Sequence, residues 1–314
     1  MKTDVLTVKD FLLGNDSFAV LCHKSPDGDT LGSAFALCLG LRSLGKKARV
    51  LCADPIPTKY SYITDCCCDE AFEEKTVIAV DVADPKLLGT LEEKYGDKVD
   101  LCIDHHPSNK DYAKITLLDG EAAAAAQIIY RVLNILNVEI DKNIANCIFT
   151  GLSTDTGCFR YPSTQPETHR IAAEMMEKGA EAGMINRIMF ETKSKGRLAI
   201  ERDVFKNMQF FLDDRCAVVY VTRELIEKAG VADDELDGIA ALTRQIEGVE
   251  AGVFLKEVDN GFKASVRTGD AVDASAVCKR FGGGGHFRAA GCTIESSLED
   301  AVREIVLVIS EYLK

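Results

Sequence analysis

The chain has 314 residues, of which 46% are hydrophobic and 28% are charged, and its formal net charge is −13. This length allows two domains with well-buried cores. The negative charge argues against a broad basic surface for long duplex nucleic acid, whereas a short anionic substrate is still possible because bound divalent cations reverse the sign of an acidic site. Because neither a signal peptide nor an apolar run of ~20 residues is evident, we expect a cytoplasmic protein that does not contact a membrane.

The first half of the chain alternates strand-like and helix-like segments, which predicts βαβ units and a parallel sheet. Helices are expected at 31–44, 121–136, 142–152 and 168–178. Short apolar strands are expected at 18–22, 48–52, 76–80 and 99–103.

The second half has a different pattern. Residues 191–205 are largely polar and charged, and we expect them to form a linker that acts as a hinge. Beyond them, the segment 251–257 should pair with 262–267 across the turn Asp259-Asn260-Gly261. A strand at 217–221, a helix at 274–280, a glycine run, a strand near Cys292 and a last helix from Leu298 complete the pattern.

The predicted fold class is therefore α/β, with two domains and a cleft between them. A parallel-sheet domain spans 1–190, and a smaller α+β substrate-binding domain spans 206–314. A homodimer is expected from base rates alone.

The chain contains twelve cysteines, most of them in apolar segments where a free thiol packs as a small hydrophobic group. No paired Cys-x-x-Cys spacing supports a zinc site. We therefore interpret Cys66-Cys67-Cys68 as buried or incidental reduced thiols and expect no disulfides.

Four acidic motifs of the first domain follow strands or end a helix. Three of them lie just past the carboxyl ends of expected strands, which is where open α/β sheets build their active sites. The fourth follows the helix that ends near Leu152. The four motifs are His23-Lys24-Ser25-Pro26-Asp27-Gly28-Asp29, Asp81-Val82-Ala83-Asp84, Asp104-His105-His106 and Ser153-Thr154-Asp155-Thr156-Gly157.

These motifs combine imidazoles with carboxylates, which suit Mn²⁺, Mg²⁺ or Fe²⁺ better than structural zinc. So many carboxylates repel one another unless cations neutralise them. A pair of metals about 3.5–4 Å apart, bridged by one carboxylate and a water, relieves that repulsion and activates the water. Taken singly, each motif has a plainer reading as a turn or a helix cap, but their combination favours a two-metal phosphoester hydrolase.

A glycine run in the second domain is a candidate phosphate or nucleotide site. Gly283, Gly284 and Gly285 let backbone N–H groups approach a phosphate closely. His286 and Arg288 add hydrogen-bond donors, and Arg267 lies on the neighbouring hairpin strand. A flexible loop is the plainer reading, but four glycines followed by a histidine are hard to explain by structure alone.

In this order, the motifs resemble those of the DHH phosphoesterase superfamily with its DHH-associated C-terminal domain, and the resemblance covers nearly the whole chain. The compact two-domain form resembles the bacterial nanoRNA ribonucleases that also dephosphorylate pAp (3′-phosphoadenosine 5′-phosphate). This resemblance implies hydrolysis of short RNA oligonucleotides to mononucleotides, removal of the 3′-phosphate of pAp, and two divalent ions, with Mn²⁺ preferred. Cyclic dinucleotides or their linear products are the alternative substrates, and a non-catalytic nucleotide sensor is a further alternative.

The resemblance also implies a role for individual residues. One metal would be held by His23, Asp27 and Asp81, and the other by Asp29, Asp81, His105 and Asp155, so that Asp81 bridges the two. Asp104 would support these ligands, and His106 would contact the scissile phosphate or protonate the leaving oxygen. The nucleotide would be held by Arg267, Gly283, Gly284, Gly285, His286 and Arg288.

Two features lie outside this assignment of ligands. Arg160, which follows the fourth motif, could approach the substrate. Relatives often carry hydroxyl side chains near the start of the helix after the third motif, but here Glu121 is followed by five alanines, which puts a substrate contact from that helix in doubt.

Overall fold

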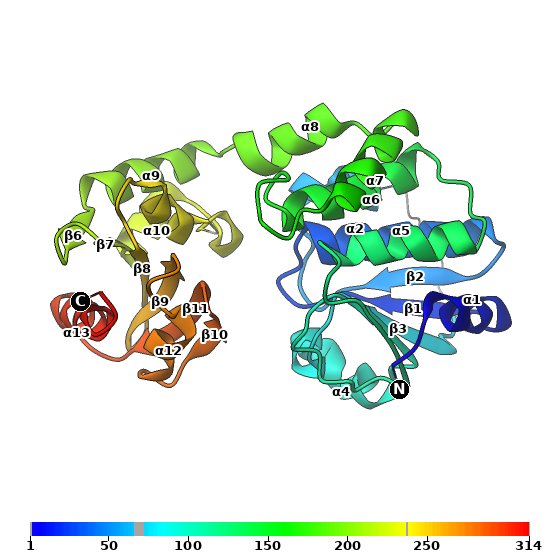
Figure 1. Ribbon diagram of the computed structural model, residues 1–314, viewed down its shortest axis with the longest axis horizontal. Coiled ribbons are helices and arrows are strands. Elements are labelled where there is room, and N and C mark those ends of the chain that lie inside the picture. The colour runs from blue at the N-terminus through cyan, green and yellow to red at the C-terminus, as the bar shows by residue number, and fades with distance from the viewer. Residues whose placement is uncertain (1, 66–71, 237, 314) are drawn as a thin grey trace. The chain divides into compact units, whose positions relative to one another are not determined.

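The computed structural model describes residues 2–65, 72–236 and 238–313 (Figure 1). The chain divides into two compact units, Met1–Thr192 and Lys193–Lys314. The boundary falls inside the expected linker 191–205, most of which is helical, because helix α9 begins at Lys195. Cys66, Cys67 and Cys68, which we interpreted as buried or incidental thiols, lie outside the described residues.

The first unit is built on a five-stranded, all-parallel sheet in the order β2-β1-β3-β4-β5. This confirms the predicted parallel sheet. Strand β5 was not predicted, because it is a short edge strand whose two end residues are only half buried. The strands are β1 (Phe18–Leu21), β2 (Ala48–Leu51), β3 (Thr76–Val80), β4 (Leu101–Asp104) and β5 (Ile115–Leu118).

Helices cover both faces of this sheet. Successive strand residues point to opposite faces, and in β1 all four residues are buried, so both faces carry apolar side chains that must be covered. Phe18 and Val20 pack with the large core that includes α2, α5 and α6, and Ala19 and Leu21 pack with a smaller core around Leu88. Figure 1 shows α2 and α5 lying over one face of the sheet and α4 on the other. The α-helices are α1 (Val5–Gly14), α2 (Gly28–Ser43), α3 (Ser61–Thr64), α4 (Glu92–Tyr95), α5 (Ala125–Ile135), α6 (Lys142–Asp155), α7 (Pro166–Glu177) and α8 (Ala182–Asn186).

Helix α5 begins four residues later than predicted. Residues 120 and 121 form a turn and residues 122–124 a bend, and all three alanines from 122 to 124 are buried. The alanine run therefore forms a tightly packed helix entry rather than a regular first turn. In the described part of the chain, no helix is long and apolar enough to span a membrane.

The second unit contains a six-stranded mixed sheet in the order β10-β11-β9-β8-β7-β6. Only β7 and β8 are parallel, and β8 and β9 form the predicted hairpin, with Val258 opposite Gly261. The elements are α9 (Lys195–Lys206), β6 (Gln209–Phe211), β7 (Cys216–Val221), α10 (Arg223–Ala229), α11 (Ile239–Leu242), β8 (Ala251–Val258), β9 (Gly261–Thr268), α12 (Ala274–Lys279), β10 (Gly284–His286), β11 (Ala289–Ile294) and α13 (Leu298–Ser310).

The glycine run is not a flexible loop. Part of it forms strand β10, which pairs with β11. A Cβ on Gly283 would lie 2.2 Å from the carbonyl oxygen of Gly291, and Gly285 has a φ of +147°. Two of the glycines therefore have the structural explanation that the sequence alone did not offer.

Candidate active site

Three of the four acidic motifs meet at one edge of the parallel sheet. Strands β1, β3 and β4 are neighbours, and their carboxyl ends lead into His23, Asp81 and the Asp104-His105-His106 motif. The sheet order therefore brings together side chains that lie far apart in the sequence. Asp155 joins them from the last residue of α6.

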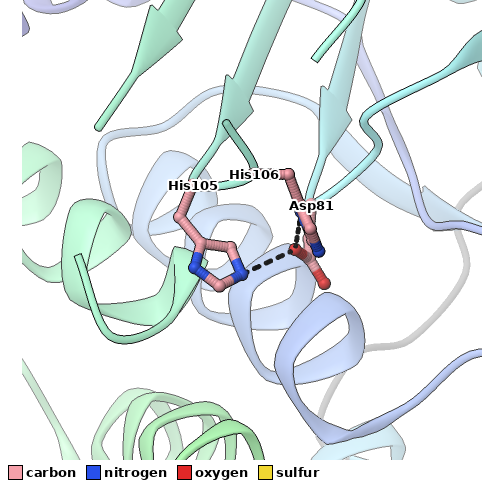
Figure 2. Close-up of side chains that lie close together, drawn as sticks. All are labelled: Asp81, His105 and His106. Carbon is pink, nitrogen blue, oxygen red and sulfur yellow. Dashed lines mark ion pairs between the residues drawn. The ribbon is translucent and has the colours of Figure 1, made fainter. Parts of the chain in front are cut away.

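Asp81 contacts the histidines of this cluster on both sides, and Figure 2 shows its side chain facing His105 and His106. Its Oδ1 lies 3.5 Å from Nε2 of His105 and 3.4 Å from Nδ1 of His106. Its Oδ2 lies 3.7 Å from Nε2 of His23. Asp81 is buried and has a φ of +60°, a left-handed conformation that is uncommon for a residue with a side chain. Such strained conformations are found most often at functional sites.

The imidazole nitrogens and carboxylate oxygens of the cluster lie close enough together to hold metal ions. They form three groups whose ligand atoms all lie within 4.8 Å of one another: His23, Asp27 and Asp81; Asp29, His105 and Asp155; and Asp81, His105 and His106. Nε2 of His105 lies 3.5 Å from Asp155 Oδ2 and 3.8 Å from Asp29 Oδ2. These separations are too long for hydrogen bonds, but they fit two atoms that each ligate one ion at about 2 Å.

One buried atom shows that the site fits a cation. Among the residues that the structure describes, no group donates a hydrogen bond to Oδ1 of Asp81, although this oxygen is buried. A buried carboxylate oxygen without a donor is costly, and a divalent ion would satisfy it. The nitrogen and oxygen donors therefore fit divalent metal ions.

The electrostatics of the cluster agree with this assignment. Burial raises the pKa of Asp81 well above its usual range, and the charges of Asp29 and Asp27 raise it further. Burial and the same two charges raise the pKa of Asp155 to about 8. Burial likewise raises the pKa of Asp29. Neighbouring carboxylates ionise together more readily when positive charge lies between them, and divalent cations supply that charge.

Asp29 is held in place by the start of α5. Its Oδ2 accepts a hydrogen bond from the backbone N–H of Ala125 at 2.6 Å, and its Oδ1 accepts one from Ala126 at 2.9 Å. The Ser33 hydroxyl donates to Oδ1 at 3.2 Å. Sequence reasoning missed these contacts, because backbone donors have no sequence signature. The alanine run serves the site by letting the helix start approach Asp29.

Asp104 and His106 form a hydrogen-bonded pair beside the cluster. Oδ1 of Asp104 lies 2.8 Å from Nδ1 of His106, and this hydrogen bond raises the pKa of His106. Asp104 is fully buried, whereas about a third of the His106 side chain is exposed. The pair can therefore present a proton donor to a substrate.

Two of the plainer interpretations of the motifs also hold. Asp27 is the N-cap of α2, and its side chain accepts hydrogen bonds from the backbone N–H groups of Asp29 and Thr30. It nevertheless also belongs to a ligand group with His23. Asp84 caps the helical turn Pro85–Leu91 by accepting from the Lys86 N–H, and it is in none of the ligand groups among the described residues.

In the second unit, the strand register brings two predicted substrate-binding residues into one row. Arg267 on β9 lies opposite Ala289 on β11, which lies opposite His286 on β10. Residues that are directly opposite share a face of the sheet, so Arg267 and His286 flank the small side chain of Ala289. Arg288 lies in the turn between the two strands and forms an ion pair with Asp270.

The other candidate substrate contacts differ in how tightly they are packed. Gly284 is open, because a Cβ there would have no described atom within 4 Å. Arg160 is exposed and donates a hydrogen bond from Nε to the carbonyl of Gly157 at 2.6 Å. It follows Gly157, Cys158 and Phe159, which have φ angles between +58° and +62°. This left-handed turn determines where the backbone of Arg160 lies relative to the fourth motif.

Comparison with known proteins places the chain in a family. A model of the DHH family N-terminal domain matches residues 17–152, and the DHHA1 domain matches residues 213–314. The bifunctional oligoribonuclease and PAP phosphatase NrnA of Thermus thermophilus is 32% identical over 303 residues, which covers 94% of this chain and 89% of that protein. NrnA of Bacillus subtilis is 25% identical over 301 residues, which covers 94% of each protein.

A solved structure shows the same fold over the whole chain. The exopolyphosphatase-related protein from Bacteroides fragilis superposes with a TM-score of 0.91 at 24% identity, covering 98% of this chain and 96% of that one. With the motifs, the site geometry and the two domain matches in agreement, the chain belongs to the DHH family of phosphoesterases, and a DHHA1 domain follows its DHH domain.

Proposed function

We propose that this protein hydrolyses short oligoribonucleotides to mononucleotides and removes the 3′-phosphate of pAp to give AMP. The names of the T. thermophilus and B. subtilis relatives support this choice of substrates over cyclic dinucleotides. The observation that carries the proposal is the geometry of Asp81, whose two oxygens face different histidines, His105 and His23. One carboxylate can thus bridge two ions, as in two-metal phosphoester hydrolysis. A homodimer and a cytoplasmic location stay predictions from the sequence.

The proposed ligand sets are based on two of the observed groups. One ion would be held by His23, Asp27 and Asp81. The second would be held by Asp29, His105 and Asp155, together with Asp81, whose Oδ1 lies 3.5 Å from Nε2 of His105. When bound, two divalent ions supply a water of lowered pKa and neutralise charge on the phosphate oxygens. We propose Mn²⁺, with Mg²⁺ or Fe²⁺ as alternatives, because the set mixes imidazole with carboxylate oxygen.

His106 is proposed to act on the substrate rather than to bind a metal. Its Nδ1, the atom nearest to Asp81, already takes part in the 2.8 Å hydrogen bond with Asp104. A protonated Nδ1 cannot ligate an ion, which leaves Nε2 for a phosphate oxygen or the leaving oxygen. The hydrogen bond with Asp104 that raises the pKa of His106 also favours its protonated, donating form.

The second unit is proposed to hold the part of the nucleotide that is not cleaved. Arg267 and His286 can both reach a phosphate from one face of the sheet. Gly284 offers open backbone between the tightly packed Gly283 and Gly285. Arg288 and, in the first unit, Arg160 are further proposed contacts.

The test compares three substrates with Mn²⁺ present: pAp, a 5′-labelled RNA pentanucleotide and cyclic di-AMP. We expect turnover of the first two and its loss on chelation. A ladder of labelled products would show attack from the 3′ end, whereas immediate release of a labelled mononucleotide would show attack from the 5′ end. Turnover of cyclic di-AMP alone would overturn the proposed substrates, and metal binding without any turnover would indicate a nucleotide sensor.

A further inference from the structure

Asn109 is the one side-chain amide that contacts Asp104 in the described part of the chain. Its Nδ2 lies 2.6 Å from Oδ2 of Asp104. Its Oδ1 accepts a hydrogen bond from the backbone N–H of Asp111 at 2.8 Å. Because a backbone N–H can only donate, the oxygen end of the amide must face Asp111. The nitrogen end of Asn109 therefore faces the carboxylate.

Asp104 needs this donor because its other oxygen is fully used. Oδ1 accepts from the backbone N–H of His105 at 2.9 Å and of His106 at 3.3 Å, and it pairs with Nδ1 of His106 at 2.8 Å. The residue is fully buried. Without Asn109, Oδ2 would lose its closest donor in a place where an unsatisfied oxygen is costly. With it, the carboxylate is held at both ends and cannot rotate.

Asn109 also connects the third motif to the second. Its backbone N–H donates to the carbonyl of His106 at 3.0 Å. Its Nδ2 lies 3.5 Å from the carbonyl of Val82, the residue that follows Asp81. The loop after the histidines is thereby attached to the strand end that carries the central carboxylate.

We propose that Asn109 is a positioning residue for phosphoester hydrolysis, which through Asp104 fixes the orientation of His106. The inference rests on the proposed function, because turnover is one of its measurements. A neutral amide suits this role, since it donates to Asp104 without adding a charge to a site that already holds several carboxylates. The functional motif therefore extends to Asp104-His105-His106-x-x-Asn109.

Two substitutions distinguish the hydrogen-bond donor of the Asn109 amide from its acceptor. Asn109→Leu keeps similar volume but removes the donor and the acceptor. Asn109→Asp keeps an acceptor for the Asp111 N–H and removes the donor. Both should lower kcat for pAp by about 10- to 100-fold, the usual effect of losing a residue that orients a metal-site side chain. KM and the number of bound metal ions should stay within about twofold of the wild type. Asn143→Leu, on the exposed first turn of α6, is the matched control.

A spectroscopic measurement on the metal-free protein tests the same claim without turnover. An imidazole N–H bonded to a carboxylate gives a downfield proton resonance, which is assigned to His106 by its absence in His106→Gln. We expect this resonance to shift or vanish in Asn109→Leu and Asn109→Asp and to persist in Asn143→Leu. If Asn109→Leu does not fold, Asn109→Asp carries the test, because it retains the turn acceptor.

A double-mutant cycle shows whether Asn109 acts through Asp104. In an Asp104→Asn background, Asn109→Leu should lower kcat by less than about twofold further. Multiplicative losses, or wild-type kcat and resonance in both single variants, would overturn the inference. If the wild type turned over neither pAp nor RNA, the proposed function would fail, whereas the resonance would still decide whether Asn109 positions His106.

Discussion

The Oδ1 atom of Asp81 and the Nε2 atom of His105 face each other at 3.5 Å, and no hydrogen bond joins them. The other carboxylate oxygen of Asp81 faces His23 at 3.7 Å. The side chain therefore lies between two sets of ligands, one on each side. This geometry makes Asp81 the residue on which both proposed metal ions depend.

Asp81→Ala should abolish binding of both ions and lower kcat by about 1,000-fold or more, because several kcal/mol of charge stabilisation are lost. Metal stoichiometry by calorimetry and turnover of pAp measure the two effects. Asp84→Ala is the matched control. Loss of this helix cap should lower the free energy of unfolding by about 1 kcal/mol and should leave kcat within twofold of the wild type. Near-normal turnover in Asp81→Ala would exclude the two-metal assignment.

The metal-free protein should become less stable as the pH rises. In the folded protein, the pKa of Asp155 is raised from 3.8 to about 8, and the pKa values of Asp81 and Asp29 are also raised. A raised folded-state pKa means that the folded protein binds the proton more tightly than the unfolded chain does. The stabilisation is complete below about pH 3.8 and is lost as the pH rises towards about 8.

Urea unfolding in the presence of a chelator, from about pH 5 to about pH 8, measures this loss. Asp155→Asn should flatten the slope, because it removes one of the groups whose pKa is raised in the folded protein. If the cluster binds the proposed Mn²⁺, the added ion should restore stability at the upper end of the range, because an ion that binds only the folded state stabilises it. A stability that rises with pH in the metal-free wild type would contradict the charge repulsion inferred for the cluster.

The close approach of α5 and α6 to Asp29 gives a third prediction. A methyl group on Gly151 would lie 2.5 Å from Cβ of Ala126 and 2.7 Å from Oδ1 of Asp29. Gly151→Ala should therefore cost about 1–3 kcal/mol of stability and weaken metal binding by displacing Asp29. Gly183→Ala is the control, because its Cβ would have no described atom within 4 Å. Unchanged metal affinity in a destabilised Gly151→Ala would show that the site tolerates movement of α5.

The sequence predicted the parallel sheet and the three motif-bearing strand ends, because apolar strands and acidic side chains leave clear patterns. It did not predict what holds these side chains. The backbone N–H groups of Ala125 and Ala126 that bind Asp29 carry no residue signature. The ion pair of Arg288 with Asp270 depends on the strand register. Strand β10 was missed because glycines favour a loop reading unless their packing against β11 is known.

His286 should contribute to substrate binding more than to chemistry. It is exposed and shares a sheet face with Arg267. His286→Ala should raise KM for pAp about tenfold with little change in kcat. Turnover of a minimal phosphodiester such as bis(p-nitrophenyl) phosphate should be nearly unaffected, because it lacks the nucleotide part. Loss of that turnover at unchanged KM would assign His286 to the chemical step instead.

The glycine run allows a sharper distinction between packing and binding, because neighbouring glycines differ in what surrounds them. A Cβ on Gly283 would lie 2.2 Å from the Gly291 carbonyl oxygen and 2.5 Å from Cβ of Cys292. Gly283→Ala should therefore lower the free energy of unfolding by about 1–3 kcal/mol. A Cβ on Gly284 would meet nothing among the described residues, so Gly284→Ala should change that free energy by less than about 0.5 kcal/mol.

If the backbone at Gly284 approaches a phosphate, the added methyl group must still weaken binding. We expect Gly284→Ala to raise KM for pAp about tenfold while kcat and thermal stability stay near the wild-type values. Steady-state kinetics and a melting curve on the same preparation measure both quantities. An unchanged KM would mean that the glycines serve only the packing of β10 on β11. The nucleotide would then be held by side chains such as Arg267 and His286 rather than by the backbone of the run.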